Sequence, residues 1–432
     1  MKLDILRRKS VVSQLLVPFF LGLGILMTFS REVIIAYFYG AQRNVEIFKI
    51  AFSLPYALFQ SLGTILVSGL LPVLLRRGQG YIYVIRRQIY GLSFSFLLIS
   101  LFTVKWQVQW LAPGFSGEDS ELLRVNLFLC WMILFFSAMI FPLRLVLQSQ
   151  DRKFLVSSTS FMFSFFFIVM LVPFHNVSSP YLLSVVSVFS IAIVYIAYLL
   201  SVDKNKKEDA YLARSIEVTS ADKVFIRRVV LGSLFYVVLL ASPRLIDRAF
   251  ASSLTEGVVA NLDYAMNIYT AIGVLIGTSS SIIYARKIAA EYDSEADRIR
   301  WLWHLMKWPL LISCSIILLI MPFLHEIVEL AYVRGAFTDK DAFQVSQILV
   351  WFIWSLPFMV SGMLLAQVLV AHTIYLLLGV LLLKLVVKLA VLLIVGVEEL
   401  SIFGGSNLLM EFSGVLIFIA LLSVNKEKEN RG

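Results

Sequence analysis

Nine lysines and arginines lie inside stretches that are otherwise apolar enough to cross a lipid bilayer. They are Arg31, Lys49, Lys105, Arg124, Arg144, Arg244, Arg248, Lys384 and Lys388. A cation in hydrocarbon costs at least about 2.5 kcal/mol, even on the scale that gives the lowest values. So many cations therefore imply a polar interior, partner charges or an anionic ligand.

Acidic residues in the same stretches are fewer than the cations. They are Glu32, Glu46, Asp247, Asp263 and Glu411. The surplus of positive charge favours an anionic ligand. Phosphate or pyrophosphate is the natural candidate, because the arginine fork matches its oxygens and a partly dry cavity strengthens the pairing.

Two groups in the second half of the chain combine charge with helical spacing. Arg244 and Arg248 lie on one helical face, and Asp247 lies one turn after Arg244, so this triad carries one surplus positive charge. Lys384 and Lys388 also share a face, and Glu411 could pair with one of them. Both groups are candidates for binding the anion, and helix pairing is the alternative for each.

The cations of the first half divide in the same way. Arg31 follows Gly22 and Gly24, which could permit a bend that turns it into a cavity, or Glu32 and Glu46 could neutralise it. Lys49 is predicted to pair with Glu46. Arg144, beside Pro142, is a further candidate for binding the anionic ligand. Lys105 and Arg124, by contrast, are expected to reach the membrane surface.

The composition requires an integral membrane protein. Of 432 residues, 59% are hydrophobic and only 15% are charged, which is more apolar surface than a soluble core can bury. About twelve helices are predicted to span the membrane. Their expected ranges are 11–38, 45–75, 88–112, 122–149, 154–173, 181–202, 229–252, 259–285, 305–324, 342–370, 374–396 and 401–424.

The polar segment 203–228 divides these spans into two sets of six. We expect an N-terminal lobe over 1–202, a cytoplasmic linker over 203–228 and a C-terminal lobe over 229–432. Arg31 precedes Gly63-Thr64 much as Arg244 precedes Gly277-Thr278, which favours a duplication. Two repeats of parallel orientation enclose a central cavity and permit alternating access.

Positive charge predicts the orientation. Twenty-five lysines and arginines fall in loops on one side and three on the other, so both termini are expected in the cytoplasm. The net charge of +9 then reflects topology and contact with membrane lipids, with no need for a nucleic-acid partner.

No pattern indicates an enzyme or a cofactor. The phosphate-binding pattern GxxxxGK[ST], nucleophile constellations and metal-ligand spacings are absent from the sequence. We therefore predict a protein that is not an enzyme and that uses neither a nucleotide nor a metal ion.

Three blocks of sequence resemble one transporter family. Ser30 to Ala36 with Phe38 to Ala41 and Leu54-Pro55 resembles the opening of MurJ/MviN-type flippases, of the multidrug/oligosaccharidyl-lipid/polysaccharide (MOP) exporter superfamily. Ile246 to Arg248 with Glu256-Gly257 resembles the start of that family's second lobe. Val333 to Thr338 with Asp341 resembles its outer loop before the tenth span.

The resemblance implies an all-α, MATE-like pair of six-helix lobes in the bacterial inner membrane. It implies a cargo of polyprenyl-pyrophosphate-linked glycan, with cavity cations holding the pyrophosphate. Arg31 matches a cavity arginine of the family, whereas Ile25, Phe59 and Asn267 stand where its peptidoglycan flippases usually have arginine. The expected cargo is thus lipid II or, slightly favoured, the repeat unit of an exopolysaccharide, capsule or O-antigen.

Two other functions stay open. A cation-coupled, MATE-like exporter of small molecules would need acids in its cavity, which the surplus of cations argues against. A non-transporting scaffold for glycosyltransferases or a polysaccharide polymerase would use the embedded charges for helix pairing alone.

Overall fold

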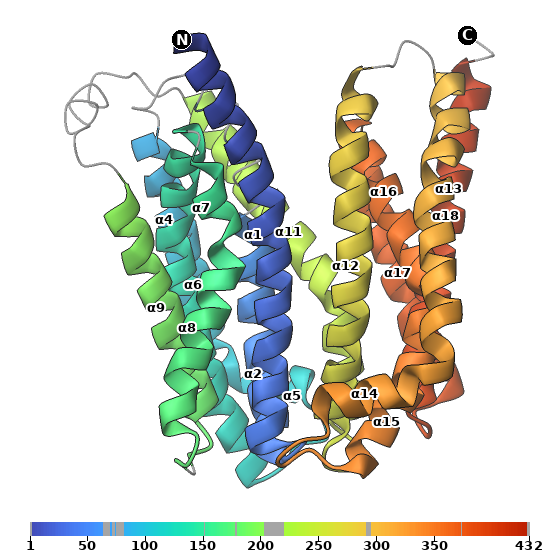
Figure 1. The fold of residues 1–432 in the computed structure, drawn as a ribbon. Helices are drawn as coiled ribbons and strands as arrows, with labels where there is room; N and C mark the ends of the chain where they lie inside the picture. The colour runs from blue at the N-terminus through green and yellow to red at the C-terminus, as the bar shows by residue number, and fades with distance from the viewer. Residues whose placement is uncertain are drawn as a thin grey trace. The chain divides into compact units, whose positions relative to one another are not determined.

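The computed structural model describes residues 2–63, 70, 74, 82–150, 152–177, 179–202, 220–290, 295–372 and 374–429, and every regular element in these ranges is helical (Figure 1). The first half contains α1 (Lys2–Tyr39), α2 (Arg43–Ala57), η1 (Leu58–Leu62), α4 (Ile82–Phe102), α5 (Val104–Leu111), α6 (Glu118–Ser149), α7 (Lys153–Ser157), α8 (Thr159–Phe174) and α9 (Leu182–Ser201). The second half contains α11 (Ser220–Ala251), α12 (Val258–Ala290), α13 (Glu295–Ile320), η5 (Met321–Phe323), α14 (Leu324–Tyr332), α15 (Asp339–Trp354), α16 (Leu356–His372), α17 (Ile374–Val395) and α18 (Ser401–Glu429).

Nine helices of the described residues are long and apolar enough to cross a membrane. A tenth candidate is the pair α15 and α16, which bends by 47° at Ser355. Pro357 lies just after that break and has no N–H to donate to the preceding turn, which accounts for the bend. The chain is thus a polytopic, all-helical membrane protein, and the count of twelve spans stays a prediction.

Two units divide the helices. The first contains Met1–Ile34 and Arg43–Ala241, and the second contains Ile35–Gln42 and Ser242–Gly432. Residues 203–219 of the predicted linker lie outside the described residues, and its last part, from Ser220, begins α11. The lobe boundaries expected from the sequence stay predictions.

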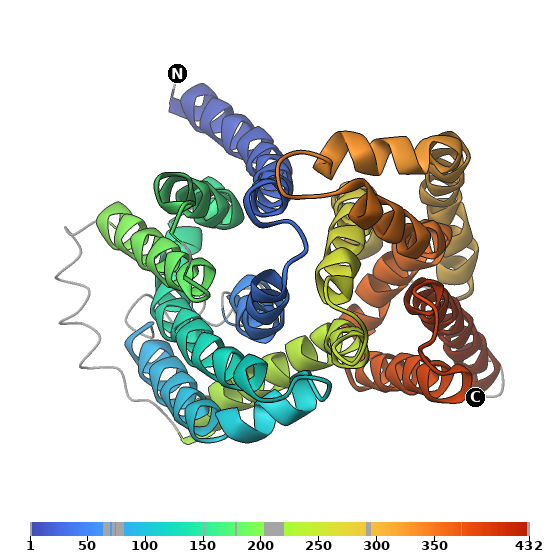
Figure 2. The same cartoon turned by 90° about the horizontal axis from the view of Figure 1, so that it is seen from below.

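In the first unit, α6 is the central helix. It packs against α2, α4 and α9, and its course between α4 and α9 can be followed along the helix axes in Figure 2. Its buried side chains include Trp131, Phe141 and Arg144. The helix therefore carries both a fully buried tryptophan and a buried cation.

In the second unit, α12 packs on α15 and α16, and α18 packs on α15 and α17. Small residues allow close approach: a Cβ at Gly404 would collide with the α15 backbone at Ile348. A buried polar network joins α12 and α18 to the break between α15 and α16, because Ser355 Oγ donates to Tyr269 Oη at 2.8 Å and Asn407 Nδ2 donates to Ser355 Oγ at 3.0 Å.

The segment Ile35–Gln42 is fixed within the second unit by backbone contacts. Ala336 N donates to Tyr37 O at 2.9 Å, and Tyr264 Oη donates to Gly40 O at 2.8 Å. Gly40 and Gly335 have φ values of +59° and +67°, which explains glycine at both positions. A capping box between Thr338 and Asp341 then begins α15.

Candidate functional site

Arg31 lies in α1 and forms a buried charge cluster in the first unit. Its Nη2 atom lies 2.6 Å from Glu32 Oε1, and Glu32 Oε2 lies 3.3 Å from Lys49 Nζ on α2. The three side chains are at most 8% exposed. Arg31 and Lys49 thus both lie within ion-pair distance of the Glu32 carboxylate.

Four aromatic rings surround the Arg31 guanidinium. Its Cζ atom lies 5.0 Å from the ring centre of Tyr56, 5.2 Å from that of Phe52, and 5.6 Å from those of Phe163 and Phe167. Each ring face offers partial negative charge to a cation, and the attraction grows when water is excluded. We call Arg31, Phe52, Tyr56, Phe163 and Phe167 the aromatic cage.

Glu46 is fully buried in the first turn of α2. It accepts a hydrogen bond from Arg43 Nη1 at 2.7 Å, and Arg43 Nε lies 3.3 Å from Asp119 on α6. An acid in the first turn is also favoured by the helix dipole. Glu46 is therefore paired with Arg43 at the start of α2.

Arg144 is buried in α6 beside Gly63, the first residue of the Gly63-Thr64 motif. A Cβ at Gly63 would collide with the Arg144 guanidinium and with the Phe141 ring. Glycine therefore provides the space that this cation occupies. Thr64 lies outside the described residues.

In the second unit, Lys388 on α17 and Asp247 on α11 form a fully buried ion pair. Lys388 Nζ lies 2.7 Å from Asp247 Oδ2, and neither side chain is exposed. Within the described part of the chain, the second carboxylate oxygen, Oδ1, has no hydrogen-bond donor. Helical spacing pointed to Arg244 and Arg248 as the partners of Asp247, whereas its closest partner comes from another helix.

The two arginines of α11 have different partners. Arg248 donates to Asp263 Oδ1 on α12 from Nε at 2.9 Å and from Nη2 at 2.7 Å. Arg244 is half-buried and donates to the Thr270 hydroxyl on α12. Among the described residues no carboxylate lies within ion-pair distance of Arg244.

Lys384 lies one turn before Lys388 and near the surface of its unit. Its Nζ atom lies 2.7 Å from Glu411 Oε2 on α18, and the two side chains are 14% and 13% exposed. Gly414 makes room for the lysine methylenes, since a Cβ there would collide with them. Glu411 thus forms its ion pair with Lys384 and not with Lys388.

The predicted site residues fall into two sets. Arg31, Glu32, Glu46 and Arg144 belong to the first unit, and Arg244, Asp247, Arg248, Lys384, Lys388 and Glu411 belong to the second. Sequence reasoning did not find the four rings around Arg31 or the Thr270 hydroxyl. The aromatic residues at spacing four on α2 and α8 were the available signal for the cage.

Comparison with known proteins gives a consistent family and fold. A family model described as the lipid II flippase MurJ matches residues 35–424. A solved structure of the lipid II flippase MurJ, in an inward closed conformation, has a TM-score of 0.79 at 17% identity over 96% of this chain and 87% of that one.

Two MATE transporters share the fold. An inward-facing MATE family transporter of the MOP superfamily has a TM-score of 0.64 at 18% identity, covering 96% of both chains. A Vibrio cholerae MATE transporter has a TM-score of 0.66 at 13% identity, covering 96% of this chain and 98% of that one. No curated protein sequence matches the chain significantly. Because the family model covers nearly the whole chain, this protein belongs to the lipid II flippase MurJ family.

Proposed function

We propose that this protein is a flippase that moves an undecaprenyl-pyrophosphate-linked glycan across the bacterial inner membrane by alternating access. The observation that supports the proposal is the environment of Arg244. Arg248, Lys384 and Lys388 each have a carboxylate partner, whereas the described residues supply none to Arg244. A pyrophosphate, with charged oxygens spaced for an arginine fork, complements such a group.

In this proposal the remaining charges have supporting roles. Arg248 and Lys388 are held by their own carboxylates, so they fix the helices around Arg244 and add positive potential. Arg31 and Lys49 both pair with Glu32, which fixes α1 against α2 in the first unit. Arg144 and Lys384 are further cations that could meet the pyrophosphate in a different conformation.

The glycan is lipid II or another undecaprenyl-linked repeat unit, and we favour the second. Phe59 and Asn267 supply no positive charge at positions where peptidoglycan flippases usually have arginine, and Phe59 is 1% exposed. Fewer cations around the pyrophosphate suggest a cargo whose binding depends more on its sugar. The proposal includes cytoplasmic termini and cooperation with glycosyltransferases or a polysaccharide polymerase.

The test is binding of purified protein to undecaprenyl-pyrophosphate lipids, measured by native mass spectrometry. Wild type is compared with Arg244→Gln and with the matched control Arg228→Gln, an exposed arginine of the same helix. Loss of one charge-assisted contact predicts about tenfold weaker binding for Arg244→Gln and no change for the control.

Comparison of lipid II with an exopolysaccharide repeat unit on the same pyrophosphate lipid then identifies the cargo. Equal binding of the lipid by wild type and both variants would show that Arg244 does not contribute to the binding site. Failure of wild type to bind any pyrophosphate lipid, where a known flippase binds, would contradict the flippase proposal itself.

A MATE-like exporter of small cations shares the fold and is the second candidate. It would bind its substrate and coupling cation through acids in the cavity. Here Glu32, Asp247 and Glu411 each face a lysine or arginine of the chain at 3.3 Å or less. Because these acids are already neutralised, the flippase proposal is favoured.

A further inference from the structure

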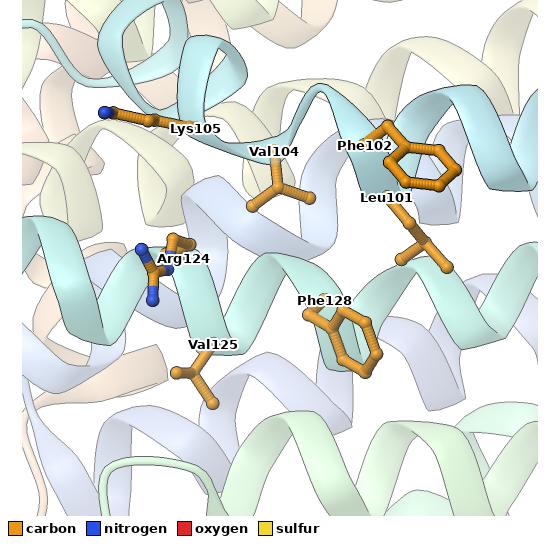
Figure 3. A pocket seen from close by; sticks show the side chains of 7 residues that line it. All are labelled: Leu101, Phe102, Val104, Lys105, Arg124, Val125 and Phe128. Atoms are coloured by element: carbon orange, nitrogen blue, oxygen red, sulfur yellow. The ribbon is translucent and has the colours of Figure 1, made fainter.

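A pocket of about 360 Å³ lies where α4 ends, in the first unit, and none of the site residues above lines it. Lys105 of α5 and Arg124 of α6 contribute positive charge at one end, and Phe102 and Phe128 contribute aromatic rings at the other (Figure 3). Val104 lies between the two ends. The pocket thus combines a basic end with an apolar end.

The break between α4 and α5 that forms this pocket is fixed by side chains. Thr103 Oγ1 donates to Ile99 O at 2.7 Å, and Gln107 Nε2 donates to Ser100 O at 2.8 Å. The indole of Trp131 on α6 donates to Gln107 Oε1 at 2.9 Å, which ties α5 to α6. Hydroxyl and amide groups that bond to backbone carbonyls stabilise such a helix interruption, so these hydrogen bonds maintain the shape of the pocket.

The surroundings of the pocket indicate that lipid covers it. Phe102 is 82% exposed and Phe128 is 49% exposed, and both helices belong to predicted membrane spans. Trp106 and Trp110 on α5 are 61% and 81% exposed, and tryptophan is enriched where a bilayer meets water. The basic end therefore lies at the depth of lipid headgroups, and the rings lie at the depth of acyl chains.

The charges select an anionic headgroup. Arg124 Nη2 lies 3.1 Å from Glu121 Oε2, but this pair is 51% and 64% exposed, and such pairs are weak. Of the two cations, only Arg124 is paired with a carboxylate within the described residues, which leaves a net positive end. We propose that this pocket binds a phospholipid with an anionic headgroup, such as phosphatidylglycerol, with its phosphate between Lys105 and Arg124 and an acyl chain along Phe102 and Phe128.

This lipid site is separate from the proposed transport site and does not depend on it. Its test measures binding of phosphatidylglycerol and of zwitterionic phosphatidylcholine to purified, delipidated protein by native mass spectrometry. The double variant Lys105→Gln/Arg124→Gln is compared with Arg334→Gln/Lys340→Gln, which removes two exposed cations elsewhere. Each basic residue near an anionic lipid contributes about fivefold in affinity, so the pocket variant is expected to lose roughly 25-fold for phosphatidylglycerol.

The variant Glu121→Gln gives a result of opposite sign. Because it removes the competing carboxylate, it is expected to strengthen phosphatidylglycerol binding, whereas a purely structural Glu121–Arg124 pair predicts no gain. Thermal unfolding in detergent confirms that each variant folds, and Phe128→Ala is expected to weaken lipid binding without changing headgroup preference.

Three results would overturn the proposal. The first is equal loss of phosphatidylglycerol by the pocket and control variants, and the second is binding that ignores the headgroup. The third is variant-dependent binding of inorganic phosphate or of an undecaprenyl-pyrophosphate lipid in place of phosphatidylglycerol, which would assign the pocket to a different anion.

Discussion

The Arg31 cluster of the first unit and the Asp247 cluster of the second hold buried cations by different means. Around Arg31, two cations share Glu32, and four aromatic faces supply the remaining attraction. Around Asp247, Lys388 and Arg248 each have a carboxylate from a neighbouring helix at 2.7 Å. The first cluster combines ion pairs to one carboxylate with aromatic faces, and the second consists of one-to-one ion pairs.

This difference distinguishes cations that stabilise the fold from cations that can bind a ligand. A one-to-one ion pair fixes the two helices that supply its partners. Because the two charges cancel, it attracts an anionic ligand only weakly. An aromatic cage stabilises a cation without cancelling its charge. We therefore expect Arg244, for which the described residues supply no carboxylate, to attract the ligand, and the paired residues to stabilise the fold.

The largest effect is expected at Lys388. Lys388→Ala leaves the Asp247 carboxylate buried without a counter-charge, which should cost about 3–5 kcal/mol in the free energy of unfolding. Lys384→Ala is the matched control on the same helix, and its 14% exposure predicts a much smaller cost. Denaturation in detergent measures both, and the double variant Lys388→Met/Asp247→Leu should regain most of the loss.

Comparable losses at Lys384 and Lys388 would show that burial does not distinguish the two pairs. A double variant no more stable than Lys388→Ala would show that the lysine acts through packing instead of charge.

A smaller effect is expected at Arg31. Arg31→Gln should cost about 2 kcal/mol, because the cation–aromatic attraction is lost while Glu32 keeps Lys49 as a partner. Arg31→Lys restores the charge but not the planar group that lies among the rings, so it should recover only part of this loss. Full recovery with lysine would mean that the cage contributes nothing beyond an ion pair. Thermal unfolding of the three proteins provides the measurement.

The rings themselves should matter less individually. Phe163→Leu removes one face of the cage and is expected to cost about 1–1.5 kcal/mol through lost packing and lost attraction. Phe165→Leu is the matched control two residues away, because Phe165 is 42% exposed and should tolerate the change. Chemical denaturation distinguishes them, and equal costs would argue against a cage.

The smallest stability effect is expected at Arg244. Arg244→Gln keeps a donor for Thr270 and strands no carboxylate, so it should change the free energy of unfolding by less than about 1 kcal/mol. Arg248→Gln, four residues later, leaves Asp263 without its arginine and should cost more. If Arg244→Gln proves the more damaging variant in unfolding measurements, the division between binding and folding cations fails.

Hydropathy predicted the helices because each backbone polar group in hydrocarbon needs a partner within its own helix. The expected range 374–396 exceeds α17 by one residue, and the expected range 401–424 lies within α18. Partners across helices were harder to foresee: Asp247 and Lys388 are 141 residues apart, and helical spacing points only to neighbours on one helix. The aromatic cage was missed for the same reason, because α2 and α8 supply two rings each.

The Asp247–Lys388 pair also has a consequence for biosynthesis. Lys388 is translated 141 residues after Asp247. At about 5–20 residues per second, the lysine emerges on the order of ten seconds later. During that interval α11 carries a carboxylate whose later partner does not yet exist. The insertion machinery or nearby water must accommodate this carboxylate until Lys388 has been synthesised.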